Sequence, residues 1–324
     1  METLENSELC FPHLLNASCR RPKRSHSEAI LIYVLLSSLS LLTVFLNLLV
    51  IISVSHFRQL QTPTNTLLLS LAVSDFLVGF LMCFQIMLID GCWLLGDGVC
   101  VVYQYLSYII TSSSVGTMVL ISVDRYVAIC EPMFYSTKIT HRRIKVCVAL
   151  SWFCSSSFQS LNLSDYLQHP GRYNTCLGEC IIVINYIAGL ADLILTFVGP
   201  ITVIIVLYTR VFVVAVSHAR AMRSQIAAVT LVTVKKSEIK AARTLGVVIV
   251  VFLFCVCPFF CVTLVGEQTV LNASSSAFVI CLFYLNSCLN PVIYAFFYPW
   301  FRKSVKVIVT LKLLQRDSCE ANML

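Results

Sequence analysis

Long apolar runs dominate this sequence of 324 residues and constrain its fold more than any other feature. About 18 or more apolar residues can cross the roughly 30 Å hydrocarbon core of a bilayer as a helix. Such spanning segments must satisfy their backbone polar groups internally, as a helix does. Seven runs can be read, at residues 29–54, 64–89, 98–123, 143–163, 183–209, 241–265 and 275–297. We therefore predict an all-α membrane protein, a bundle of seven transmembrane helices.

The composition agrees with an integral membrane domain that takes up nearly the whole chain. Apolar residues make up 58% and charged residues only 12%, with a mean hydropathy of +0.85, whereas soluble domains carry roughly 25% charged residues. We expect an extracellular N-terminal segment at 1–28, the helical domain at 29–298, and an amphipathic helix with a cytoplasmic tail at 299–324. The tail sequence YPWFRKSVKVIVTLKLL places basic and apolar residues at helical spacing, which favours a helix lying on the inner leaflet.

The distribution of basic residues predicts which side of the membrane each loop faces. With the N-terminus outside, five basic residues are extracellular and the other 18 are cytoplasmic, as the positive-inside rule favours. The net charge of +7 is then explained by loops near anionic membrane lipid, and no nucleic-acid partner is needed. This orientation places the NAS triplet of Asn16 outside, where it could accept a glycan.

Two aspartates lie well inside predicted spans, Asp75 in SLAVSDF and Asp192 in ADLILTFVGP. A charged side chain at that depth is costly unless it has a partner or a function, and no lysine or arginine is comparably deep. An ion-coupled transporter could use two such carboxylates, but it would predict inverted repeats, and the sequence shows none. Alternatively, Asp192 has only a structural role and is protonated or hydrogen-bonded to its neighbours.

Asp75 has candidate partners of a kind that suits a sodium ion. Carboxylate, amide and hydroxyl oxygens are the ligands of hard cations, and Ser114, Asn286 and Asn290 lie at matching depth in other spans. Sodium is the only ion that we expect. The sequence contains no zinc-site spacing, phosphate-binding loop or nucleophile elbow, so we predict that the protein is not an enzyme.

Further motifs close particular spans and together carry a family resemblance. DRY ends the third span and NPVIY the seventh, and prolines interrupt the last three spans. With FLNLLVI, SLAVSDF and Trp152, these motifs resemble the rhodopsin-like G-protein-coupled receptors over all seven spans. The resemblance implies that coupling and activation depend on the following residues: Asp124, Arg125, Tyr126, Tyr208, Pro258, Asn290, Pro291 and Tyr294.

A narrower resemblance is to the trace amine-associated receptors. NSCLNPVIYAFFYPWF fits the seventh-span signature of that family, and the paired cysteines of CLGEC are similar to its second outer loop. This implies an olfactory-type amine receptor at the plasma membrane of sensory neurons, coupled to a heterotrimeric stimulatory G protein. It also implies two disulfides, Cys100–Cys180 and Cys19–Cys176.

Three residues depart from the usual pattern of amine receptors. Ser107 stands where the third span normally carries an aspartate, Val256 replaces the sixth-span tryptophan, and Cys281 replaces a seventh-span tryptophan. Asp192, eight residues before Pro200, falls where the fish-expanded branch of the family carries an alternative amine-binding aspartate. The resemblance therefore implies that Asp192 is the counter-ion for the ligand.

The expected ligand is a small protonated amine whose identity the sequence does not name. An aromatic wall could add cation–π attraction of about 0.5–2 kcal/mol per ring, although each such residue could equally be a packing residue. The predicted binding residues are Asp192, Ser107, Tyr108, Thr196, Phe259, Phe260 and Tyr284. The alternative within the same family is a receptor for a non-amine ligand, in which Asp192 is structural.

Overall fold

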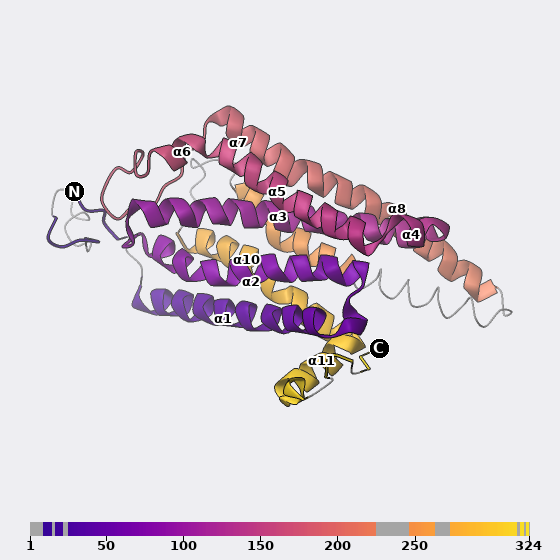
Figure 1. Ribbon diagram of the computed structural model, residues 1–324. Coiled ribbons are helices and arrows are strands. Elements are labelled where there is room, and N and C mark those ends of the chain that lie inside the picture. Colours follow the sequence, from indigo (N-terminus) through magenta and orange to yellow (C-terminus); the bar gives the residue numbers. More distant parts are fainter. Residues whose placement is uncertain are drawn as a thin grey trace.

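The computed structural model describes residues 9–14, 17–21, 25–224, 246–262, 273–315, 318–320 and 322–323. Its long helices lie side by side (Figure 1). In chain order the elements are α1 (His26–His56), η1 (Arg58–Leu60), α2 (Pro63–Asp90), α3 (Gly96–Cys130), α4 (Pro132–Lys138), α5 (His141–Asn162), α6 (Ser164–Gln168), α7 (Tyr186–Asp192), η2 (Leu193–Val198), α8 (Gly199–Ser224), the helix Gly246–Val262, α10 (Ala273–Phe297), α11 (Pro299–Val309), η3 (Lys312–Leu314) and η4 (Ser318–Glu320).

Local sequence explains where several helices begin and end. The hydroxyls of Ser25, Thr62 and Thr140 accept hydrogen bonds from backbone N–H groups in the first turns of α1, α2 and α5, which satisfies donors that have no helical partner. Pro63 follows its cap directly, where its missing N–H costs nothing. Gly91 ends α2 in the left-handed conformation, at φ 73°.

Each of the seven predicted spans overlaps a helix of the structure. Five described helices are long and apolar enough to cross a membrane: α1, α2, α3, the continuous helix Tyr186–Ser217, and Phe278–Phe297 of α10. The described part of the sixth, Gly246–Val262, is shorter. α5, with 22 residues, is also long, but its sequence is more polar than that of the other spans. The chain is therefore a multi-pass membrane protein.

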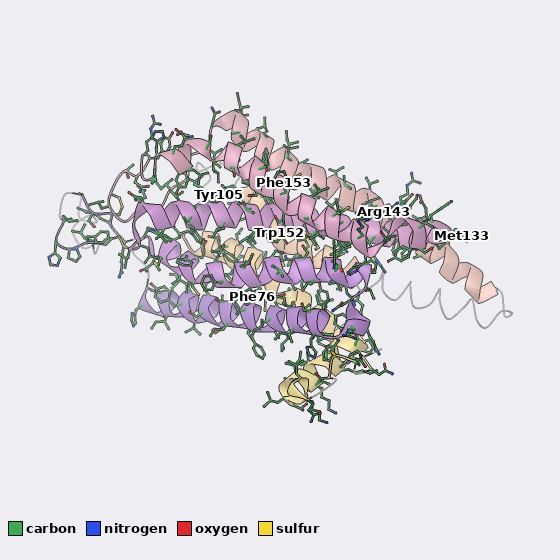
Figure 2. All side chains as sticks on the ribbon, in the orientation of Figure 1. Phe76, Tyr105, Met133, Arg143, Trp152 and Phe153 are labelled. Carbon is green, nitrogen blue, oxygen red and sulfur yellow. A yellow bond between two sulfur atoms is a disulfide. The ribbon has the colours of Figure 1, made fainter. Side chains whose placement is uncertain are left out.

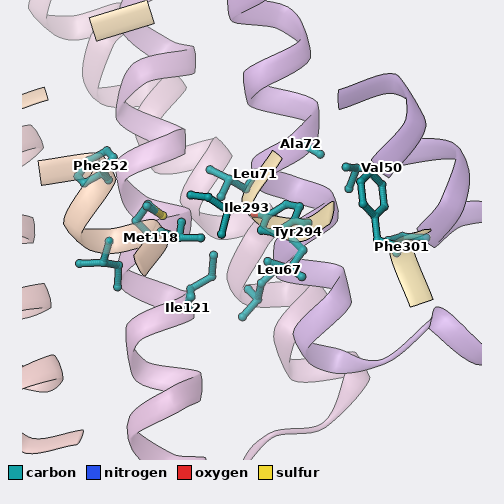
Figure 3. Packing of buried hydrophobic residues seen from close by; sticks show 14 of the residues in the cluster. Val50, Leu67, Leu71, Ala72, Met118, Ile121, Phe252, Ile293, Tyr294 and Phe301 are labelled. Carbon is teal, nitrogen blue, oxygen red and sulfur yellow. The ribbon is translucent and has the colours of Figure 1, made fainter. Parts of the chain in front are cut away.

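The outside of the bundle is apolar, as a lipid-facing surface requires. Leu41 of α1, Phe153 of α5, Phe212 of α8 and Phe296 of α10 are 67–77% exposed, and Figure 2 shows Phe153 on α5 among the side chains that project from the helices. The inside holds a core at the end of the bundle near α11, where Leu67, Leu71, Met118, Ile121, Phe252, Ile293 and Tyr294 are packed together (Figure 3).

α3 has a central place in the packing of the bundle, because it contacts α2, α5 and α8. Polar side chains on α3 can therefore reach residues of three other spans. α11 follows the bundle after Tyr298 and buries Trp300, Phe301 and Ser304, one face of the predicted amphipathic helix. Asn16, the predicted glycan acceptor, lies outside the described residues.

Candidate functional site

Asp192 is the last residue of α7, and its carboxylate faces α5. Nε2 of Gln159 donates to Oδ1 of Asp192 at 2.7 Å, and Gln159 is only 1% exposed. Nδ2 of Asn162 donates in turn to Oε1 of Gln159 at 3.4 Å. Among the residues that the structure describes, no lysine or arginine forms an ion pair with Asp192. In the described residues, the carboxylate thus has a neutral donor and no cation as its partner.

A π-helical turn, η2, follows Asp192 directly. The N–H of Gly199 donates to the carbonyl of Ile194, five residues earlier, and a Cβ on Gly199 would lie 3.0 Å from that oxygen. Pro200 comes next and has no N–H to continue the ordinary helical pattern. Such π turns inside helices often occur at functional sites, and this one sets the direction of the residues that come after Asp192.

Thr196, one of the predicted binding residues, directs its hydroxyl to the backbone of its own helix. Oγ1 of Thr196 donates to the main-chain carbonyl of Asp192 at 2.7 Å, as threonine hydroxyls in helices commonly do toward the residue four positions earlier. Ser107 behaves similarly and donates to the carbonyl of Tyr103 at 2.8 Å. Both side chains therefore have backbone partners in this structure.

Five aromatic rings form a continuous arc from η2 to α10. Phe197 stacks on Phe260 with ring centroids 4.0 Å apart, and Phe260 meets Phe259 edge to face at 5.6 Å. Phe259 then contacts Phe283 at 4.8 Å, and Phe283 contacts Tyr284 at 5.6 Å. The arc joins three of the predicted residues, and the sequence prediction missed Phe197 and Phe283.

Tyr284 closes the arc on a glutamine that was also missed. The hydroxyls of Tyr284 and Tyr103 both donate to Oε1 of Gln85 in α2, at 3.0 and 2.7 Å. Tyr108 lies within electrostatic range of Asp192, whereas Tyr105 is bonded to Ser160 at 2.6 Å. Gln85 and Gln159 are polar residues inside apolar spans, which is the signal that could have identified them.

The two replacements of tryptophan, Val256 and Cys281, fill the bundle with smaller side chains. Val256 is 3% exposed and packs in the same core as Phe252. Cys281 is half-buried beside Tyr284 and Leu285. Neither position carries a large ring that would move when a ligand enters.

Asp75 lies in a second polar cluster, deeper in the bundle. It is 1% exposed, and Nδ2 of Asn290 donates to its Oδ2 at 2.8 Å. Within the described part of the chain, Oδ1 of Asp75 and the side-chain oxygens of Asn286 and Asn290 are buried without a hydrogen-bond partner. Ser114 is buried as well, but no hydrogen bond joins it to Asp75 in the described residues. Buried oxygens without donors are the chemistry that a hard cation satisfies.

Arg125 is locked to its neighbour Asp124 at the opposite end of α3 from the disulfides. Nε of Arg125 donates to Oδ2 of Asp124 at 2.9 Å, and its Nη2 donates to Asp124 and to Thr64. Tyr135 of α4 donates to Oδ1 of Asp124 at 3.1 Å. Arg125 is 3% exposed and Asp124 is fully buried, so the arginine is held inside the bundle in this conformation.

The other residues assigned to activation lie on α3, on α8, on the helix Gly246–Val262 and on α10. Tyr208 and Tyr294 have buried hydroxyls without partners in the described residues, which leaves both free to acquire one. Tyr126 packs against the small cluster of Ala128, Ile129 and Val211. Pro258 lies inside the helix Gly246–Val262 and Pro291 inside α10, where each removes a backbone hydrogen bond.

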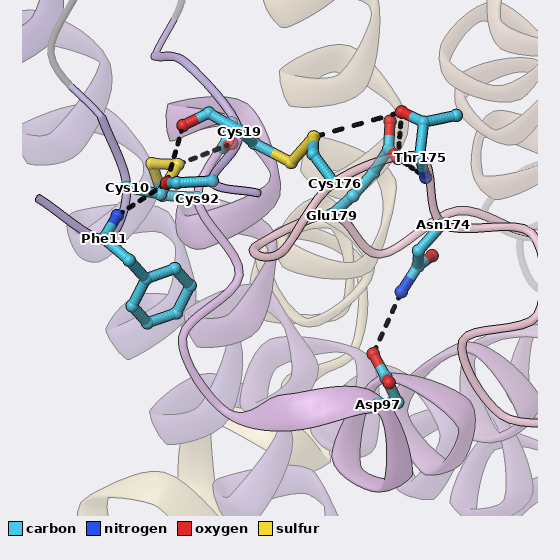
Figure 4. The surroundings of a disulfide bond; sticks show 11 residues. Cys10, Phe11, Cys19, Cys92, Asp97, Asn174, Thr175, Cys176 and Glu179 are labelled. Atoms are coloured by element: carbon cyan, nitrogen blue, oxygen red, sulfur yellow. Dashed lines mark hydrogen bonds between the residues drawn. A yellow bond between two sulfur atoms is a disulfide. The ribbon is translucent and has the colours of Figure 1, made fainter. Parts of the chain in front are cut away.

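Three disulfides join the segments at the N-terminal end of the bundle, and Figure 4 shows two of them, Cys10–Cys92 and Cys19–Cys176. Cys100–Cys180 and Cys19–Cys176 are the pairs that the resemblance implied. The third, Cys10–Cys92, was not predicted, because nothing in the spacing relates these two cysteines. Backbone bonds from Cys19 to Leu177 and from Trp93 to Gly178 hold the same segments together.

The comparisons with known proteins agree with this arrangement. The profile of the 7 transmembrane receptor (rhodopsin family) matches residues 46–294. Trace amine-associated receptor 13c of Danio rerio is 36% identical over 98% of this chain and 96% of its own length. Trace amine-associated receptor 1 of Mus musculus is 35% identical over 96% and 98%, and receptor 8a of Rattus norvegicus is 36% identical over 96% and 95%. These proteins are receptors, as the sequence predicted, and not enzymes. The chain belongs to the rhodopsin family of seven-transmembrane receptors and, within it, to the trace amine-associated receptors.

Proposed function

We propose that this receptor detects protonated amines and binds the ammonium group at Asp192. The observation that carries the proposal is the carboxylate itself, which receives a hydrogen bond from Gln159 and has no cation partner in the described residues. A partly desolvated carboxylate selects for cations, because its charge is poorly compensated when the site is empty. The family supports a small-molecule ligand and a G protein as partners, and membership of a receptor family argues against the ion-coupled transporter.

The aromatic arc supports the same ligand class. Phe197 lies in η2, directly after Asp192, and its ring packs against the rings of Phe260 and Phe259 in the next helix. Such rings attract an ammonium by about 0.5–2 kcal/mol each. Gln85, held between Tyr103 and Tyr284, supplies polar groups toward α2. An amine with an apolar body would thus meet a charge on α7 and an apolar wall from the later helices.

The test is a charge-removing substitution at Asp192. Asp192→Asn keeps the shape and the hydrogen-bonding capacity of the side chain, and truncating one member of a buried charge pair costs about 3–5 kcal/mol, or two to four decades in potency. A cyclic AMP screen of amines should therefore lose every response. Asp192→Glu should keep partial activity with an altered size preference, and Ser107→Asp in the Asp192→Asn background should restore amine sensitivity.

The control is Asp97→Asn, which removes an exposed carboxylate that accepts from Asn174. It should leave amine potency within about two-fold, because exposed charges are screened by salt. An Asp192→Asn receptor that reaches the surface and answers amines at unchanged concentration would mean that the aspartate is structural and that the ligand belongs to another class.

We further propose an extracellular N-terminus and coupling to a stimulatory G protein in olfactory sensory neurons. The three disulfides gather at the N-terminal end, and disulfides persist in oxidising compartments. Arg125, at the opposite end of α3, is the residue that would engage the G protein once spans five and six separate. Arg125→Ala should abolish the cyclic AMP response while surface expression and amine binding persist.

We also propose that Asp75 binds a sodium ion. Its free oxygen and those of Asn286 and Asn290 are the residues that would hold the ion. A bound cation would supply the positive charge that this buried carboxylate lacks. Because Asn290 links α2 to α10 through Asp75, an ion there would favour the conformation seen in this structure.

A further inference from the structure

A cleft of about 500 Å³ opens between α3, α4 and α5 at the same end of the bundle as Arg125. Its apolar walls include Leu120 and Val123 of α3 and Val146 of α5. Val123 is 37% exposed and Val146 is 50% exposed, so the cleft opens toward the surface that faces lipid. It is separate from the amine site, which lies near the opposite end of α5.

Three cations line this cleft: Lys138, Arg142 and Arg143. Nη1 of Arg143 donates to the carbonyls of Thr137 and Lys138 at 2.8 and 3.2 Å, which fixes its guanidinium across the turn between α4 and α5. Lys138 pairs with Glu131 at 2.5 Å, with both side chains partly exposed. Among the described residues, Arg142 has no ion-pair partner.

The acid that also lines the cleft does not neutralise these cations. Asp124 is fully buried and is already bound by Arg125, Thr64 and Tyr135. The cleft therefore combines apolar walls with an excess of positive charge at its rim. Figure 2 shows Arg143 and Met133 at this end of the bundle, and Met133 is 86% exposed on α4, as expected for a segment at a membrane surface.

We propose that this cleft binds an anionic phospholipid of the inner leaflet, with its phosphate at Arg142 and Arg143 and an acyl chain along Val123 and Val146. Charge complementarity carries the choice of occupant, because basic pockets between transmembrane helices on the cytoplasmic side bind anionic headgroups. Arginine is suited to phosphate through paired N–H donors. The proposal rests on the proposed orientation but not on the amine as ligand.

A lipid bound in the cleft would also stabilise the pair of Arg125 and Asp124. Arg143 and Lys138 hold the end of α4, and Tyr135 of the same helix donates to Asp124. A headgroup bound at the turn between α4 and α5 would keep Tyr135 in place. The lipid is thus expected to favour the conformation in which Arg125 is buried.

The experiment titrates full-length receptor in a neutral detergent with phosphatidylinositol 4,5-bisphosphate that carries a fluorescent acyl chain, and anisotropy reports binding. A basic residue that lies beside the anionic headgroup contributes a factor of about five in affinity. Arg142→Gln should therefore weaken binding about five-fold, and the double variant Arg142→Gln/Arg143→Gln about 30-fold. Cys147→Phe, which fills the cleft without changing charge, should weaken it as well.

The matched control is Lys306→Gln/Lys312→Gln, which removes two exposed charges outside the cleft, in α11 and η3, and should change affinity less than two-fold. Arg142→Gln breaks no hydrogen bond or ion pair of the described residues, so it reports on the cleft even if the double variant unfolds. Unchanged binding by Arg142→Gln, or equal weakening by the control, would overturn the proposal. Equal competition by the water-soluble headgroup would show a free-phosphate site instead. No amine is present, so the result is independent of Asp192.

Discussion

Gln159 is expected to determine amine potency through its hydrogen bond to Asp192. Its Nε2 lies 2.7 Å from Oδ1 of Asp192, and its 1% exposure excludes a replacement by bulk water. A hydrogen bond to a charged group contributes about 1.5–3 kcal/mol. If this bond orients the carboxylate toward the ammonium, its loss should raise the half-maximal amine concentration about 10- to 150-fold.

The substitution that tests this role is Gln159→Met, because methionine has a similar volume and adapts to its surroundings but donates no hydrogen bond. Cyclic AMP dose–response curves for a series of amines give the potency, and surface labelling of the intact cells gives expression. The structure predicts a parallel shift for all amines, since the carboxylate is common to them. In the Asp192→Asn background, Gln159→Met should add no further loss of amine response.

Ser160→Ala is the matched control for Gln159→Met. It removes a hydrogen bond to Tyr105 at 2.6 Å from the next residue of the same helix and leaves Asp192 untouched. Its potency should stay within about two-fold of the wild type. The reasoning fails if Gln159→Met is expressed normally and responds at wild-type concentrations, or if Ser160→Ala loses as much potency, because the effect would then come from the packing of α5.

Three other predictions concern groups outside the amine site. Tyr135→Phe removes a hydrogen bond to the buried Asp124. It should increase the fraction of receptor in the active conformation, and with it basal cyclic AMP, by up to about ten-fold. Unchanged basal signalling at equal expression would contradict a role for Tyr135 in holding the pair of Asp124 and Arg125. Replacing external and internal sodium by a bulky organic cation should increase agonist potency in the wild type, and Asp75→Asn should abolish this difference. Tyr173 donates to Asp165 and, with Arg172, holds the pKa of that carboxyl below its usual 3.8. The stabilisation that the Asp165 carboxylate gives to residues 164–174 is therefore present above pH 3.8 and is lost as pH falls through the lower folded pKa. Amide exchange of residues 164–174, corrected for intrinsic rates, should therefore be constant from pH 7 to pH 5, and loss of protection in that range would refute the assignment.

The spans and the motif residues could be predicted because each depends on short segments of sequence. An apolar run of sufficient length must become a helix in a bilayer, whatever lies beside it, and this is why the predicted spans overlap helices of the structure. The family signature in NSCLNPVIYAFFYPWF is likewise local. Asp192 stood out for the same reason, since a lone carboxylate in an apolar segment is visible without a structure.

The partners of these residues were decided only by tertiary structure. Gln159 reaches Asp192 because α5 and α7 pack together with a particular rotation, and no sequence pattern relates positions 33 residues apart on different helices. The π turn η2 sets the direction of Phe197, and Cys10 meets Cys92 only because the N-terminal segment folds back over α2. The sequence specifies which groups are buried in the membrane, whereas the packing of the helices decides which of those groups touch.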